Sequence, residues 1–240
     1  MLLELLKDLL NKLGVIVVLA FLLSRSSFFQ RYILKEKMNL YYKIFFSIVF
    51  GVIGIAGTYW GIPIGGGIAN SRSIVIVVAG MLGGTAVGTG SGLIAGIHRM
   101  LIPGGRLTAF ACGISTILGG VIGGKLKKYI DEKQDKWIYG ILTGIMVESI
   151  QMGIILLIAR PFEEALHLVK IIFVPMTFIN AMGIGIFVIL IQQIYDEREK
   201  AGAVKAQLAL NIATLTLPYL RKGLNESSAN KTAHIIYEMT

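Results

Sequence analysis

The chain has 240 residues, of which 55% are hydrophobic and 15% are charged, and its mean hydropathy is +0.72. Too little polar surface remains to cover a soluble domain, so the composition indicates a polytopic membrane protein. The 23 Lys and Arg residues outnumber the 14 Asp and Glu residues, but most basic residues lie in short segments between apolar runs, a pattern typical of topology signals and not of nucleic-acid binding.

Five apolar stretches are long enough to cross a bilayer, which takes about 20 residues per helix. They lie at about 2–24, 43–60, 108–126, 137–159 and 169–194. The first contains acidic and polar residues and lacks a small-residue cleavage pattern, so we interpret it as a retained helix and not as a signal peptide. The fold class predicted is therefore all-α, a membrane helix bundle with five full spans.

A sixth apolar segment, 73–98, is rich in glycine and allows two interpretations. Its glycines recur every fourth residue, at Gly80, Gly84, Gly88, Gly92 and Gly96, which lets helix backbones pack closely. As one continuous helix it is long enough to cross the membrane. As a helix broken near Gly83–Gly84 or within 88–92, it would enter and return on the same side, which requires that protein or water cover its backbone.

The placement of positive charge favours the broken, re-entrant form. Two connecting segments are basic, with Arg25, Arg31, Lys35, Lys37 and Lys43 in 25–43 and Lys125, Lys127, Lys128, Lys133 and Lys136 in 125–136. Basic loops stay in the cytoplasm, and we expect the hydrophilic segment after residue 195 there too. Five crossings with an outer N-terminus and a re-entrant 73–98 satisfy all three placements. A six-span arrangement with a cytoplasmic N-terminus ranks second, because it puts 25–43 on the wrong side.

The C-terminal part is predicted to be a helix that leaves the membrane. Residues 195–217 begin charged and then carry apolar residues at helical spacing from Ala203 to Leu217, as expected for packing on a partner helix. Pro218 is expected to stop or kink this helix. A polar stretch from Lys222 to Lys231 leads into an amphipathic segment, so the sequence reads as if it stopped inside the first helix of a soluble domain.

Two arginines next to apolar helix are the strongest candidates for a binding site. Arg72 precedes the glycine-rich segment and Arg99 follows it, and a guanidinium in hydrocarbon costs about 2.5–3.5 kcal/mol on insertion scales unless it faces a polar cavity or a counter-ion. A small anion is the natural partner. The alternative is that both side chains reach lipid headgroups. In the re-entrant arrangement Arg72, Arg99, Cys112 and Ser115 all lie toward the outer face.

Other polar residues in the apolar stretches are candidates for support of this site. Glu148 and Gln151 lie three residues apart in one span, and we expect a polar contact across the bundle that balances an arginine, with a proton relay as the weaker alternative. Asn180 is expected to link helices, and His98 to be interfacial rather than a ligand contact. A single cysteine and three histidines argue against a disulfide and against a metal site.

Several motifs together resemble the LytS-type sensor histidine kinases. They are Asn70-Ser-Arg72 after a glycine-rich turn, Ala79-Gly80 with the glycine ladder, Gly96-Ile-His98-Arg99, Ala206-Gln207-Leu208-Ala209-Leu210, and Thr216-Leu217-Pro218-Tyr219-Leu220. The resemblance implies a five-transmembrane receptor domain over 1–195, a connector over 196–230 and the start of a GAF domain at 231–240. It also implies a multi-pass protein of the bacterial cell membrane with a cytoplasmic C-terminus.

The resemblance further implies partners that this chain does not contain. Full-length members of the family continue into a kinase domain that uses ATP and Mg²⁺, act as homodimers and phosphorylate a LytTR-type response regulator. None of the kinase motifs is present in these 240 residues, so we expect no catalytic residue, no cofactor and no enzymatic activity in this chain.

The family is linked to the sensing of extracellular pyruvate or related signals, and to control of murein hydrolysis, autolysis and carboxylate uptake. Its proposed carboxylate contacts match Arg72, Arg99, Cys112 and Ser115 here. The chemistry agrees, because a guanidinium offers paired N–H donors to a carboxylate and a serine hydroxyl can donate to a keto oxygen. Cys112 as an apolar filler and Ser115 bonded to its own helix are the alternatives.

Two further classes of function share parts of this pattern. A secondary transporter also uses broken helices and central polar residues, and glycine-rich helices also suit an oligomeric, holin-like pore. The absence of a recognisable inverted repeat and the helical stalk after the last span favour a receptor. Flux measurements in liposomes separate both alternatives from a receptor.

Overall fold

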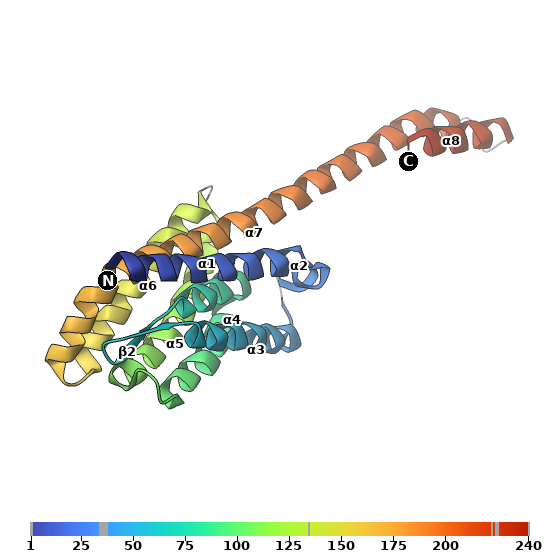
Figure 1. The fold of residues 1–240 in the computed structure, drawn as a ribbon. Coiled ribbons are helices and arrows are strands. Elements are labelled where there is room, and N and C mark those ends of the chain that lie inside the picture. The colour runs from blue at the N-terminus through green and yellow to red at the C-terminus, as the bar shows by residue number, and fades with distance from the viewer. Residues whose placement is uncertain (1, 34–37, 134, 222, 224–225, 240) are drawn as a thin grey trace. The chain divides into compact units, whose positions relative to one another are not determined.

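The computed structural model describes residues 2–33, 38–133, 135–221, 223 and 226–239 (Figure 1). The elements in chain order are α1 (Leu2–Arg25), α2 (Ser27–Ile33), α3 (Leu40–Tyr59), β1 (Ile62–Ile64), β2 (Gly67–Ala69), α4 (Arg72–Leu101), a 3₁₀ turn (Arg106–Thr108), α5 (Ala109–Asp131), α6 (Lys136–Ile158), α7 (Phe162–Arg221) and α8 (Glu226–Met239). The predicted all-α membrane bundle is confirmed. Lys35 and Lys37 of the basic loop, Lys222 and the terminal Thr240 lie outside the described residues.

The chain forms two compact units, 1–191 and 192–240. Within the described residues, five helices of the chain are long and apolar enough to cross a membrane: α3, α4, the segment 106–130 that contains α5, α6 and α7. One of the five, α4, is the glycine-rich segment described below, and the other four coincide with predicted spans. The predicted span 2–24 forms α1, which is not among the five because its first half carries Glu4, Lys7, Asp8 and Lys12.

Although it is polar at its start, α1 packs along the bundle. Its buried side chains Leu5, Leu9, Leu13 and Ile16 are three or four residues apart and form one helical face. Leu13 reaches Gly183 of α7, where a Cβ atom would lie 2.8 Å from the leucine side chain. The helix therefore belongs to the bundle of the first unit.

Helix α4 is broken at Gly84 and doubles back on itself. Gly84 has φ 77° and ψ −176°, a conformation that strains residues with a side chain. A Cβ atom on Gly88 would lie 2.7 Å from Cα of Gly80, whereas eight residues of straight helix would separate the two by about 12 Å. The segment is therefore the broken, re-entrant form of the two that the sequence allows.

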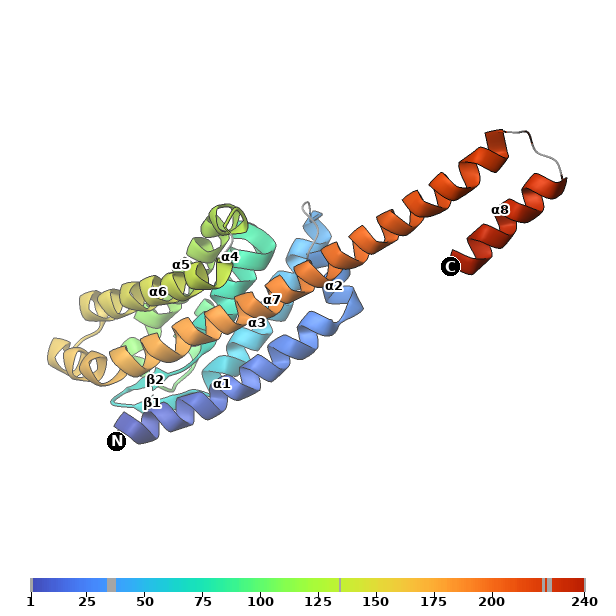
Figure 2. The same cartoon turned by 90° about the horizontal axis from the view of Figure 1, so that it is seen from above.

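The two ends of α4 meet beside the C-terminal end of α3. A Cβ atom on Gly57 would lie 3.4 Å from Cα of Arg72, the first residue of α4, and the Tyr59 hydroxyl lies 3.3 Å from Nε2 of His98 near its end. Helix α4 packs against both α3 and α5, and it lies between them in Figure 2. The α4 hairpin thus brings Arg72 and Arg99 to the same end of the bundle.

Glycines make the hairpin possible, because the backbones of the two halves of α4 and of α5 meet there without side chains between them. A Cβ atom on Gly80 would lie 2.5 Å from the Gly124 nitrogen, and one on Gly96 would lie 2.6 Å from the Gly113 oxygen. On Gly88 it would overlap the carbonyl oxygen of Gly120. The glycine ladder of α4 therefore packs against a matching set of glycines on α5, as small residues do in membrane bundles.

A short β-hairpin that the sequence did not predict precedes α4. Its strands pair Ile62 with Ala69 and Ile64 with Gly67. Both turn residues, Gly65 and Gly66, have positive φ (49° and 75°), as a two-residue type I′ turn requires. The hairpin lies against the 3₁₀ turn, because the Leu107 N–H donates to the Gly66 carbonyl oxygen at 3.2 Å.

The second unit holds the C-terminal part of α7 together with α8. Pro218 does not stop α7, which runs on to Arg221, although the proline has no N–H to donate to the helix. Helix α8 begins at Glu226, five residues before the segment 231–240 in which the sequence placed the next domain. The predicted domain boundaries stay predictions.

The close contact between Gly88 and Gly120 predicts a specific loss of stability. Gly88→Ala should lower the thermal unfolding midpoint of the detergent-solubilised protein, because overpacking typically costs about 1–3 kcal/mol. Gly153→Ala on α6 is the matched control, since a Cβ atom there meets nothing within 4 Å. Equal midpoints for the two variants would contradict the packing described.

The α4 hairpin also predicts which segments share a face of the membrane. On a Cys112→Ser background, an impermeant thiol reagent should label Pro63→Cys and Arg106→Cys from the same face, and Glu132→Cys only from the other. These three positions are exposed or at an exposed turn. A straight α4 would place residues 63 and 106 on opposite faces, so labelling from opposite faces would refute the hairpin.

Candidate functional site

The structure places all four of the predicted contact residues in the interior of the first unit. Arg72 begins α4, Arg99 lies near its end, and Cys112 and Ser115 lie on α5. Both arginines are 0% exposed. Arg72 interacts electrostatically with Arg99, Cys112 and Glu148, and Arg99 interacts with Cys112. The hairpin of α4 and the first turns of α5 therefore bring the two arginines and the cysteine into one cluster.

Arg72 is held by neutral groups and keeps one free donor. Its Nε donates to Oγ1 of Thr116 at 2.9 Å and its Nη1 to Oγ1 of Thr58 at 2.8 Å. Its backbone N–H is capped by Oδ1 of Asn70 at 3.1 Å. The second terminal nitrogen, Nη2, is buried without a hydrogen-bond partner among the described residues.

Arg99 is enclosed by the loop that follows α4. Its Nη1 donates to the Gly104 carbonyl oxygen at 3.0 Å and its Nη2 to that of Gly105 at 2.7 Å, with Oγ1 of Thr108 at 3.3 Å. Gly105 has φ 65°, and a Cβ atom there would lie 2.6 Å from Nη2 of Arg99. Only glycine fits this turn. The Nε of Arg99 is buried without a partner among the described residues.

Ser115 and Cys112 share one turn of α5. The Ser115 hydroxyl has two acceptors in reach, the Cys112 carbonyl oxygen at 3.0 Å and Oε1 of Gln151 at 3.2 Å. Thr116 donates to the same carbonyl at 2.6 Å. The local bond that the sequence allowed as an alternative for Ser115 is thus present, and Gln151 supplies the polar contact across to α6.

Glu148 lies in a second polar cluster next to Arg72. It is 0% exposed, and its Oε1 accepts a hydrogen bond of 2.7 Å from Nδ2 of Asn180 on α7. The same amide nitrogen lies 3.3 Å from the carbonyl oxygen of Asn70, two residues before Arg72. Asn180 therefore links α6, α7 and the start of α4, as expected for a residue that joins helices.

His98 is partly exposed and faces α3. Its Nε2 lies 3.3 Å from the Tyr59 hydroxyl, and the two rings are 5.4 Å apart. This position agrees with an interfacial residue rather than with a direct ligand contact.

Sequence reasoning missed the threonines that hold the arginines. Thr58, Thr108 and Thr116 come from three different elements, and nothing in their local sequence marks them. Thr116 alone carried a signal, because it lies four residues after Cys112 and next to Ser115 on the same helix. The other two become visible only when α3 and the 104–108 loop are packed against α4.

Neither side chain of this arginine pair is exposed at the surface, which argues against lipid headgroups as their partners. Two positive charges are buried together, and each keeps an N–H donor without a partner among the described residues. Buried charges need a counter-charge and hydrogen bonds. The arrangement is suited to a small anion that accepts hydrogen bonds from both guanidinium groups.

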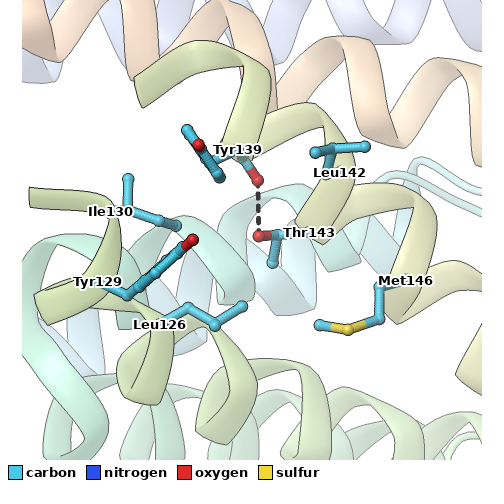
Figure 3. Close-up of a pocket in the computed structure, with 7 residues that line it drawn as sticks. All are labelled: Leu126, Tyr129, Ile130, Tyr139, Leu142, Thr143 and Met146. Carbon is cyan, nitrogen blue, oxygen red and sulfur yellow. Dashed lines mark hydrogen bonds between the residues drawn. The ribbon is translucent and has the colours of Figure 1, made fainter. Parts of the chain in front are cut away.

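A separate groove lies between α5 and α6 and differs in character. It has a volume of about 170 Å³ and is lined by Leu126, Tyr129, Ile130, Tyr139, Leu142, Thr143 and Met146. The Thr143 hydroxyl in this lining donates a hydrogen bond to the Tyr139 carbonyl oxygen at 2.7 Å, as Figure 3 shows. An apolar groove without a cationic group in its lining does not suit a small anion.

Comparison with known proteins agrees with the arrangement. Residues 26–194 match the family model 5TM-5TMR_LYT, described as the 5TMR of 5TMR-LYT. The chain is 37% identical to "Sensor protein LytS" of Bacillus subtilis over 249 residues, which cover 96% of this chain and 42% of that protein. It is 36% identical to "Sensor histidine kinase BtsS" of Escherichia coli K12 over 235 residues, which cover 96% of this chain and 41% of that protein.

A third relative, "Sensor histidine kinase YpdA" of Escherichia coli K12, is 33% identical over 226 residues. No solved structure matches the chain significantly. The chain spans about two fifths of the length of these curated relatives. On the family match and these identities, the chain belongs to the LytS-type family of five-transmembrane receptor domains, and it is similar to the membrane input part of sensor histidine kinases.

Proposed function

We propose that this chain binds a small extracellular carboxylate such as pyruvate between Arg72 and Arg99 and passes the signal on through α7. The observation that carries this proposal is the pair of unpartnered donors, Nη2 of Arg72 and Nε of Arg99, on two fully buried guanidinium groups. Two cations in a low-dielectric interior repel each other. A bound anion between them would remove this repulsion and satisfy both donors.

A carboxylate fits the donor set better than a larger anion does. A carboxylate is planar and accepts N–H donors from guanidinium groups, and each arginine has one buried nitrogen without a hydrogen-bond partner among the described residues. Cys112 lies near both arginines, and the Ser115 hydroxyl one turn further supplies a donor that can turn from Gln151 to a keto oxygen. Pyruvate carries both groups.

The ligand would enter through the β-hairpin and the 104–108 loop. These two segments lie at the end of the bundle where α4 begins and ends, and the loop carbonyls cover Arg99. The basic segment 125–136 covers the last turns of α5, at its opposite end, and the connection to α6. Because basic loops stay in the cytoplasm, the site faces the outside of the cell and residues after 191 lie inside.

Helix α7 is the element suited to carry the signal. Asn180 of α7 contacts Glu148 and the backbone of Asn70, next to Arg72, and the helix continues to Arg221 in the second unit. Its later residues Val204, Leu210, Leu215 and Leu217 are exposed, and these apolar side chains offer surface for the same helix of a second copy. Ligand would then bias two arrangements of a homodimer.

In the whole protein, this movement would control a cytoplasmic kinase. The relatives are named sensor histidine kinases, so we propose that the protein uses ATP and Mg²⁺ in a kinase domain and phosphorylates a response regulator of the LytTR type. The output would be control of autolysis and the cell wall or of carboxylate uptake.

A secondary transporter is the second candidate, because the broken helix α4 resembles the interrupted helices of transporters. The 60-residue helix α7, which continues far beyond the length of a membrane span, favours the receptor.

The arginine pair predicts a loss of carboxylate binding on substitution. Calorimetry with pyruvate should show affinity reduced about 30-fold or more in Arg72→Ala and in Arg99→Ala, since removal of one partner of a buried charge pair costs about 2–5 kcal/mol. Arg72→Lys should recover part of the affinity, because an ammonium group lacks the planar fork.

Arg106→Ala is the control, because Arg106 is exposed on the 3₁₀ turn of the same loop and should keep the affinity of the unmodified protein. If both buried-arginine variants stay folded and bind pyruvate as tightly as the Arg106 variant does, the ligand is bound elsewhere.

A further inference from the structure

Glu148 is a buried charge that the arrangement of ligand contacts leaves unexplained. Among the side chains whose burial is described, Arg72, Arg99 and Glu148 are the charged ones that are buried, and each is 0% exposed. Asn180 holds one carboxylate oxygen at 2.7 Å, and the buried Ser73 side chain also interacts with the carboxyl group. A carboxyl group in this setting is costly unless a charge compensates it.

With Glu148 ionised, the three buried side chains carry a single net positive charge. Arg72 and Arg99 contribute two positive charges, Glu148 contributes one negative charge as a carboxylate, and Arg72 interacts electrostatically with Glu148. A low-dielectric interior is most stable when its charges cancel. One more negative charge would make the cluster neutral, and two would leave it negative beside Glu148.

We propose that Glu148 is the fixed counter-charge of the arginine pair and restricts the site to anions that carry a single negative charge. This inference rests on the proposed function and adds to it the charge of the ligand and the residue that sets it. Glu148 does not touch the ligand in this account; Asn180 holds it in place, and it acts through the electrostatic potential at Arg72.

A purely structural role for Glu148, in which its bond to Asn180 only joins α6 to α7, predicts something different. In that case replacement by the neutral isostere Gln would change stability, or the affinity for all ligands alike. It would not change the preference between anions of different charge. The ratio of two affinities is therefore the quantity to measure.

Oxamate and oxalate are suitable probes because each has the same number of non-hydrogen atoms as pyruvate and carries a carboxylate next to a second carbonyl carbon. At neutral pH oxamate carries one negative charge and oxalate carries two, so size cannot explain a preference between them. Calorimetry on the unmodified protein should show oxamate bound about tenfold or more tightly than oxalate. Equal affinities would overturn the inference without any variant.

Glu148→Gln should raise the ratio of oxalate affinity to oxamate affinity about tenfold or more, because it removes one negative charge and keeps the shape of the side chain. Glu148→Asp keeps the charge and should keep the preference for oxamate. Glu163→Gln is the matched control, because Glu163 is exposed at the start of α7 and solvent screens its charge.

The outcomes separate the two proposals. If the Gln variant binds oxamate with the ratio unchanged, Glu148 contributes no charge to the site and the inference is wrong, while carboxylate binding stands. If the unmodified protein binds neither probe nor pyruvate, the proposed function itself fails and the inference fails with it.

Discussion

The structure depends on two guanidinium groups that are buried in the membrane part of the chain. Neither Arg72 nor Arg99 reaches solvent, so every donor must find an acceptor inside the protein or on a bound ligand. Threonine hydroxyls and loop carbonyls take most of these donors, and these are neutral acceptors. The fold thus supplies hydrogen bonds from neutral groups, and in our proposal Glu148 and a bound anion supply the compensating negative charge.

The position of the arginines follows from glycine. Because Gly84 can adopt a positive φ and Gly80 and Gly88 carry no side chain, α4 folds back and packs both of its halves against α5. A straight helix of 30 residues would have placed Arg72 and Arg99 at opposite ends, about 40 Å apart. The packing of small residues therefore brings the two arginines together, and the proposed ligand site depends on it.

The sequence predicted the helical class and favoured the break in α4, because both depend on composition, spacing or charge that is local in the chain. It left two interpretations of the arginines open, an anion site and anchors to lipid headgroups. It predicted a crossing at 2–24 that the polar start of α1 does not support, and it missed the β-hairpin, whose two three-residue strands are too short to show alternation. Thr58 and Thr108 could not be found, because their roles arise only from contacts between distant elements. The identity of the ligand stays a proposal.

A direct measurement of the central claim is the distance between the ligand and the two arginines. Solid-state NMR on protein with ¹⁵N-labelled arginine and pyruvate ¹³C-labelled at its carboxylate measures the dipolar coupling between them. The account predicts couplings that correspond to a carboxylate hydrogen-bonded to two guanidinium groups in the unmodified protein. In Arg72→Lys and in Arg99→Lys, the carboxylate should couple only to the one arginine that remains. Saturating binding of pyruvate without any such coupling would show that the carboxylate is not held by this pair.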